Sequence, residues 1–211
     1  VNFDKASHLA QQIKNSIRDK VKLSCSIGVS TNKLIAKIAS DFKKPDGLTV
    51  VSPEKIEEFL EQLKIRVIPG IGKKTEERFT QMNLETINDL KKLDVFTLIK
   101  EFGRKHGTYI FNASKGLDNE PVKEREASIQ YSKLSTLKKD SNDYDFLAEN
   151  LKELCIELHK VVQKNNRMFK SIGIQFILSD LTNKTKSRML KNHTSSLEEL
   201  QKNASQLLKE A

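Results

Sequence analysis

The residues best suited to chemistry in this chain form a short turn, Pro69-Gly70-Ile71-Gly72-Lys73, between two helical patterns. Pro69 ends the first pattern, and two glycines one residue apart permit backbone angles that other residues avoid. Such a turn directs consecutive backbone N–H groups, backed by the N-terminus of the next helix, toward one point. Gly70, Ile71, Gly72 and Lys73 therefore predict a socket for a phosphate oxygen, which reads no base and suits sequence-independent binding.

The alternative interpretation is an ordinary tight turn between two helices. The neighbouring Val67-Ile68-Pro69 and Lys73-Lys74 favour the phosphate socket, because the whole chain is basic. Its 211 residues hold 37 Lys and Arg against 28 Asp and Glu, a net charge of +9. This excess favours nucleic acid as the partner, with an anionic membrane surface second.

A second candidate is Lys44, on a proline-stiffened turn directly after a helical pattern. An ammonium group held there is a good point charge for a polyphosphate. The alternative of a solvated turn lysine stays open on these grounds.

Clustered carboxylates that could hold two divalent metals are the pattern to expect in a basic nucleic-acid enzyme. Asp41 and Asp46 instead flank a lysine pair, and the acids of 54–62 fall on the exposed side of a helical pattern. The four histidines are scattered, and Cys25 and Cys155 read as buried thiols of a reducing compartment. We therefore predict no catalytic residue and no metal ligand in this chain.

Cations and hydroxyl groups recur on two polar strand patterns near the C-terminus. Lys133, Ser135 and Thr136 belong to the first pattern, and Lys184, Lys186 and Arg188 alternate along the second. Such faces without an aromatic stripe are expected to lie along phosphates and not to stack on bases. The alternative is a solvent-facing sheet whose edge lysines discourage aggregation.

The elements that must position these residues follow from hydrophobic periodicity. Residues 1–51 alternate helix and strand, and residues 53–116 read as short helices broken at glycines. Residues 117–127 read as a linker, and the remainder as strand, helix, two strands and helix. The predicted helices are 3–19, 53–63, 73–82, 85–92, 94–102, 105–115, 143–164 and 194–210, with one more running through Phe42; the predicted strands are 21–29, 48–51, 128–137, 169–178 and 183–190.

The stretch Ser24-Cys25-Ser26-Ile27-Gly28-Val29, continuing to Lys44-Pro45-Asp46-Gly47, resembles the end of the palm domain of Y-family translesion DNA polymerases, in particular the DNA polymerase IV type. Ile68-Pro69-Gly70-Ile71-Gly72 is similar to the thumb hairpin of that family. The resemblance implies an α+β chain with a palm remnant at 1–52, a helical thumb with a helix-hairpin-helix at 53–116, a linker at 117–127 and a β-α-β-β-α little finger lacking its last strand at 128–211.

The resemblance also implies an activity for the intact parent, which is template-directed, error-prone DNA synthesis past lesions in DNA repair. Magnesium and a deoxynucleoside triphosphate would serve this nucleotidyltransferase, with the metal ligands outside this chain. Lys44 would contact the triphosphate, and Gly70–Lys73 with Lys133, Ser135, Thr136, Lys186 and Arg188 would hold primer-template DNA. A sliding clamp reached through a C-terminal tail, a monomeric state and a cytoplasmic location at the nucleoid are further implications; no membrane segment is expected.

Two other interpretations each explain part of the sequence. A stand-alone helix-hairpin-helix module of a repair protein would explain the hairpin but has no use for a palm-like segment. An RNA-binding protein would explain the charge but not the palm resemblance.

Overall fold

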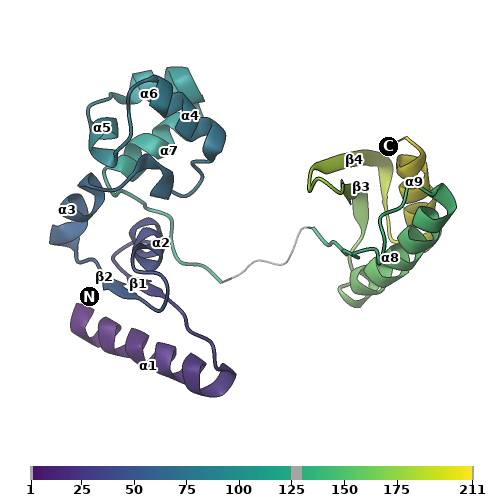
Figure 1. Ribbon diagram of the computed structural model, residues 1–211, viewed down its shortest axis with the longest axis horizontal. Helices are drawn as coiled ribbons and strands as arrows, with labels where there is room; N and C mark the ends of the chain where they lie inside the picture. Colours follow the sequence, from purple (N-terminus) through teal and green to yellow (C-terminus); the bar gives the residue numbers. More distant parts are fainter. Residues whose placement is uncertain (1, 125–129, 211) are drawn as a thin grey trace. The chain divides into compact units, whose positions relative to one another are not determined.

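The computed structural model describes residues 2–124 and 130–210 of the chain (Figure 1). Two compact units divide it, Val1–Glu124 and Arg125–Ala211, and each is described by itself. None of the described helices is long and apolar enough to cross a membrane.

The first unit begins with two helices and two short parallel strands. They are α1 (Phe3–Val21), β1 (Ile27–Val29), α2 (Lys33–Phe42) and β2 (Leu48–Val50), with Ile27 opposite Leu48. The Asn32 side chain accepts a hydrogen bond from the Ile35 N–H and so caps α2. Ile35 and Ile38 on the packed side of α2 are buried.

The first strand is shorter than the sequence pattern predicts. Residues 21–29 alternate as a strand would, but α1 continues to Val21 and ends at Lys22, whose φ of 59° is left-handed. Leu23 is exposed, and only Ile27–Val29 pairs with β2. Alternation alone cannot hold a strand, because its backbone groups need a partner, and β2 supplies only three residues.

The rest of the first unit is helical, as predicted, and its helices α4 to α7 gather into one cluster (Figure 1). The predicted helix 53–63 is divided into a 3-10 turn and a short α-helix. The elements are η1 (Pro53–Lys55), α3 (Ile56–Glu61), η2 (Ile65–Val67), α4 (Lys73–Gln81), α5 (Ile87–Lys91), α6 (Val95–Phe102) and α7 (Arg104–Ser114). Their buried residues, such as Phe79 and Leu98, form one continuous core with those of α2.

The second unit places two helices on one side of an antiparallel strand pair (Figure 1). Its elements are α8 (Tyr144–Lys164), β3 (Phe169–Ile177), β4 (Asn183–Thr194) and α9 (Leu197–Lys209). Ile172 and Ile174 of β3 pack with Leu200, Leu207 and Cys155. Burial raises the pKa of the Cys155 thiol to about 11.

One predicted strand of this unit is not formed. The predicted strand 128–137 begins with two residues that lie outside the described ones, and 130–137 has no regular secondary structure. Residues 130–137 pair with neither β3 nor β4, so the order of the described elements is α-β-β-α. A strand pattern with no neighbour to accept its hydrogen bonds stays irregular.

Two glycines of the first unit make a matched stability test. A Cβ on Gly28 would lie 2.1 Å from the carbonyl oxygen of Ala36 and 2.4 Å from the backbone nitrogen of Ser40, whereas one on Gly72 would meet nothing within 4 Å. Gly28→Ala should therefore lower the free energy of unfolding of this unit by about 3 kcal/mol, because α2 must move away from β1. Gly72→Ala should lower it by at most about 1 kcal/mol, because alanine is a poorer N-cap than glycine but meets no neighbouring atom at this position. Denaturation followed through hydrogen exchange of the first unit's core amides measures both, and equal stabilities would contradict the packing described.

Candidate nucleic-acid interface

The hairpin of residues 68–73 is anchored by two buried side chains and exposes two glycines. Ile68 and Ile71 are 1% and 5% exposed, and the Ile71 N–H donates to the Ile68 carbonyl at 3.1 Å. Gly70 and Gly72 are exposed between and after them. The Ile71 N–H is therefore bonded within the turn and is not the free donor that the sequence predicted. The buried Ile71 side chain instead anchors the hairpin in the core.

The two glycines differ in their backbone angles. Gly70 has a φ of +88°, the left-handed region that favours glycine. Gly72 has a φ of −87° and a ψ of 175°, extended angles that any residue adopts. The prediction that both positions need glycine for the backbone is therefore wrong at Gly72, where glycine matters because it leaves space.

The start of α4 presents open donors in that space. Gly72 is the N-cap of this helix and has no side chain to accept a hydrogen bond, so the helix lacks a side-chain cap. Its carbonyl accepts from the N–H groups of Thr75 and Glu76. Within residues 2–124 and 130–210, no acceptor is bonded to the N–H groups of Gly72, Lys73 or Lys74. The first N–H groups of a helix are unsatisfied unless a cap, water or a ligand accepts from them, and they attract anions.

Tyr109 of α7 braces the hairpin from the other side. Its hydroxyl donates to the Pro69 carbonyl at 2.7 Å, and its ring lies 3.8 Å from the place of a Cβ on Gly70. The His106 ring stacks against the Tyr109 ring with centroids 6.2 Å apart. Burial, and then the charge of Asp118, raises the pKa of Tyr109, so the phenol remains a donor. Sequence reasoning missed this contact, because no local pattern links residues 40 positions apart.

Lys44 lies on the turn between α2 and β2, in the sheet part of the first unit. Its ammonium nitrogen is 2.5 Å from a carboxylate oxygen of Asp41, and its side chain is 61% exposed. The ammonium groups of Lys37 and Lys44 hold the pKa of Asp41 below its ordinary value. Lys44 is thus accessible, and its partner is a single exposed carboxylate of the kind that exchanges easily for another anion.

The predicted cations of the second unit are placed differently from one another. Lys133, Ser135 and Thr136 are all exposed in the irregular segment before α8. The Lys133 ammonium lies 3.5 Å from the Glu157 carboxylate of α8. These three residues remain free of the unit's core.

Lys186 and Arg188 do not lie on an open sheet face, which corrects the prediction. Arg188 is opposite Ile172 and Lys186 is opposite Ile174, and directly opposed residues share a face. Both isoleucines belong to the core under α9, so these cations are on the helix-covered side. Arg188 donates to Gln206 at 2.6 Å and Glu210 at 2.5 Å, both on α9, while Lys186 is exposed.

The open face of the strand pair carries no charge at the eight positions that lie opposite one another across it. All eight are exposed, and five of them carry a hydroxyl or an amide group: the residues are Ser171, Gly173, Gln175, Ile177, Asn183, Thr185, Ser187 and Met189. The alternation of side chains along each strand separates the two faces of the sheet in the sequence. It does not show which of the two faces the helices cover. Long cationic side chains can lie on the covered side because their ends reach solvent at its border.

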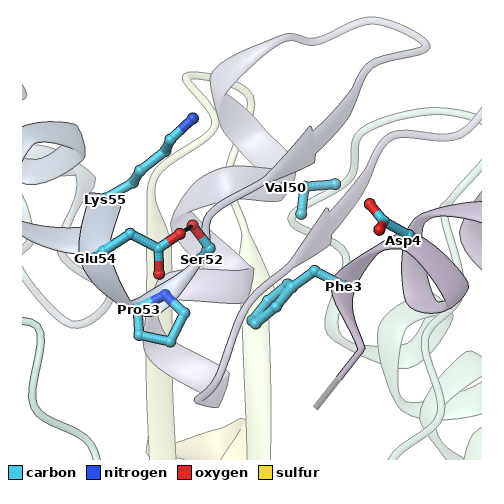
Figure 2. Close-up of a pocket in the computed structure, with 7 residues that line it drawn as sticks. All are labelled: Phe3, Asp4, Val50, Ser52, Pro53, Glu54 and Lys55. Carbon is cyan, nitrogen blue, oxygen red and sulfur yellow. Dashed lines mark hydrogen bonds between the residues drawn. The ribbon is translucent and has the colours of Figure 1, made fainter.

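An open hollow of about 560 Å³ lies beside β2 and is lined by residues of α1 and η1. Figure 2 shows these residues. The hollow contains two carboxylates, Asp4 and Glu54, and that of Glu54 accepts a hydrogen bond from the Ser52 hydroxyl. Across the described ranges, no three His, Cys, Asp or Glu side chains come together as ligands for a metal ion. The donors at the hairpin are therefore a better candidate site than this hollow.

Three family models match the chain in succession. Residues 1–41 match the impB/mucB/samB family, 66–118 match the thumb domain of DNA polymerase iota, and 128–211 match the impB/mucB/samB family C-terminal domain. The second match contains the hairpin with its open helix N-terminus. The chain is therefore similar to a DNA polymerase thumb domain over residues 66–118, with segments on both sides that match one polymerase-related family.

Curated relatives and solved structures agree. The chain is 73% identical to DNA polymerase IV of Nitrosopumilus maritimus and 40% identical to that of Methanosarcina acetivorans, covering 100% and 99% of this chain but only 58% and 57% of the relatives. A Y-family polymerase chimera, Dbh-Dpo4(243-245)-Dbh, is 30% identical with a TM-score of 0.84, and DinB from Sulfolobus solfataricus is 30% identical with a TM-score of 0.57. Each covers 99% of this chain, which spans 59% and 60% of theirs.

The chain belongs to the Y family of DNA polymerases, and its relatives are of the DNA polymerase IV type. The alternative of a stand-alone helix-hairpin-helix module is wrong, because the matches extend over both sides of the hairpin domain.

The brace on the hairpin can be tested by removing one hydroxyl. Tyr109→Phe should lower the free energy of unfolding of the first unit by about 1 kcal/mol, because the Pro69 carbonyl loses its donor. It should also speed hydrogen exchange in the hairpin. Tyr144→Phe is the control, since the Tyr144 hydroxyl has no hydrogen bond within the described part of the chain. Equal effects of the two substitutions would contradict the bracing role.

Proposed function

We propose that this chain is the DNA-holding part of an error-prone Y-family DNA polymerase that copies past lesions and grips primer-template DNA by its phosphates. The observation that carries the proposal is the start of α4, where a glycine N-cap leaves the N–H groups of Gly72, Lys73 and Lys74 without acceptors among the described residues. A phosphate oxygen satisfies such donors without reading the bases.

We propose the domain order palm remnant (1–52), thumb (53–116), linker (117–127) and little finger (128–211). The matched ranges 1–41, 66–118 and 128–211 support this order, as does the separate second unit. In the thumb, Gly70, Gly72 and Lys73 face the phosphate, and Ile71 anchors the turn. The whole protein is proposed to act as a monomer on chromosomal DNA in the cytoplasm, with a sliding clamp as partner.

In the little finger, Lys133, Ser135, Thr136 and Lys186 are the proposed backbone contacts. Their exposure supports this role, because an exposed cation or hydroxyl group can reach a phosphate. Arg188 joins them only where a phosphate replaces Glu210 as its partner.

Lys44 is the proposed contact for the incoming deoxynucleoside triphosphate, in exchange for its bond to Asp41. The described residues do not fit the magnesium that such polymerases use, because their carboxylates do not gather. We therefore assign the magnesium ions and the reacting centre to residues outside this chain.

Gly72→Val should lower the affinity for primer-template DNA at least about 10-fold, because its side chain fills the space in front of the donors. The extended angles of Gly72 suit valine, so the fold should be preserved, whereas Gly70→Val would also strain the left-handed turn. If about three to five phosphates are neutralised, log affinity should fall against log salt with a slope of about −3 to −4 in the unaltered chain.

Fluorescence anisotropy with duplex, primer-template and single-stranded DNA at two salt concentrations measures both quantities. Gly72→Ala is the control for a smaller side chain in the space in front of the donors. Lys5→Met is the control for the loss of one positive charge elsewhere in the chain. An unchanged affinity of a folded Gly72→Val variant would make the hairpin an ordinary turn, and a slope near zero would contradict every nucleic-acid interpretation.

The chain alone should bind primer-template DNA and incorporate no nucleotide, because its carboxylates form no metal site in the described ranges. Primer extension with magnesium and the four deoxynucleotides tests this. A full-length DNA polymerase IV relative is the positive control. Measurable primer extension by the chain alone would contradict the assignment of the reacting centre to residues outside this chain.

A further inference from the structure

Lys14 of α1 is the one charged residue that is nine-tenths buried within the described ranges, with 5% of its surface exposed. Lysine is rarely so buried, because removing an ammonium group from water costs several kcal/mol unless oxygens replace the water. Its position in the middle of a helix that is otherwise mostly exposed therefore needs an explanation.

Four oxygens surround the Lys14 ammonium nitrogen. They are the carbonyls of Cys25 at 2.8 Å, Asp46 at 2.6 Å and Gly47 at 3.2 Å, and the Asp46 carboxylate at 2.7 Å. Three of the four belong to the turn that carries Lys44, and the fourth lies just before β1. One side chain thus ties α1 to the entry points of both parallel strands.

The turn itself needs this support. Asp46 has a φ of 58°, a left-handed angle that costs free energy in any residue except glycine and is least costly in Asn and Asp. Its carboxylate also accepts from Arg18, and the hydrogen bond from Lys14 holds the pKa of Asp46 below its ordinary value. The Gly47 N–H donates to the Ser26 hydroxyl at 3.0 Å, on the same side of the turn.

Among the described residues, the partner of the Lys44 ammonium group is the exposed carboxylate of Asp41. The direction of the Lys44 side chain therefore follows from the backbone of residues 44–47. The buried Lys14 ammonium group holds that backbone through Asp46 and Gly47, and Asp46 is two residues from Lys44.

We infer that Lys14 is a positioning residue for nucleotide binding, which holds the 44–47 turn so that Lys44 meets the triphosphate. This inference rests on the proposed role of Lys44. A purely structural role for Lys14 would predict a loss of stability and no specific link to Lys44.

The test is a double-substitution cycle in the intact polymerase with single-nucleotide incorporation. Lys44→Ala should raise the KM for the incoming nucleotide about 10-fold, the loss of one charge-assisted contact. Lys14→Met should raise the same KM about 3-fold to 10-fold with kcat and DNA affinity nearly unchanged. In the Lys44→Ala background, Lys14→Met should raise it no further, because Lys14 acts through Lys44.

Asp46→Gly is the second variant, in case Lys14→Met fails to fold. Glycine adopts the left-handed angle at no cost and removes the carboxylate that Lys14 holds, so its KM effect should likewise vanish in the Lys44→Ala background. Lys5→Met, on the exposed side of α1, is the control for loss of charge and should leave KM unchanged.

The outcomes separate the inference from the proposal beneath it. An unchanged KM in Lys44→Ala would remove the triphosphate role of Lys44 and this inference with it. Lys44→Ala could raise the KM while Lys14→Met and Asp46→Gly each raise it by the same factor with and without Lys44→Ala. That result would overturn the positioning role alone. If both single variants at 14 and 46 keep an unaltered KM, the positioning role is also overturned.

Discussion

The proposed grip on DNA depends on one group of atoms, the first N–H groups of α4. A helix start needs acceptors, and most helices of this chain supply them with an Asn, Asp, Ser or Thr cap, as Asn32, Thr86, Asp94 and Ser196 do. Helix α4 has Gly72 at that position and so leaves its donors open to the outside. The surrounding structure maintains this arrangement: Ile68 and Ile71 fix the turn in the core, and Tyr109 binds the Pro69 carbonyl.

The net positive charge of the chain adds a long-range attraction to the contacts that the open donors can make. The net charge of +9 draws the chain toward a polyanion at long range, whereas the donors at α4 act only at contact distance. Lysines on exposed surface provide mobile point charges that suit many phosphate positions. Arg188 shows the opposite case, since its guanidinium joins β4 to α9 through Gln206 and Glu210. Its location on a basic strand is therefore explained by the packing of the second unit.

The hairpin and the helical region could be predicted from sequence because their signals are local. Glycine, proline and capping residues stand at each break, and the periodicity of α4, α6 and α7 matches one packed side. The rest depends on partners far along the chain. The predicted strand 21–29 is shorter in the structure because only three of its residues pair with β2. Strand β4 extends to Thr194 because Thr194 pairs with Phe169. The side of the sheet on which Arg188 lies is the side that α9 covers. No local pattern in the sequence marks Lys14 as buried, because its acceptors are up to 33 residues away.

The most direct measurement is hydrogen exchange of individual backbone amides with and without primer-template DNA. If the account is right, DNA slows exchange at Gly72, Lys73 and Lys74, which have no acceptor within the described chain, and leaves the side-chain-capped start of α5 unaffected. Unaltered exchange at these three amides while DNA is bound would contradict it, because the phosphate would then be held elsewhere.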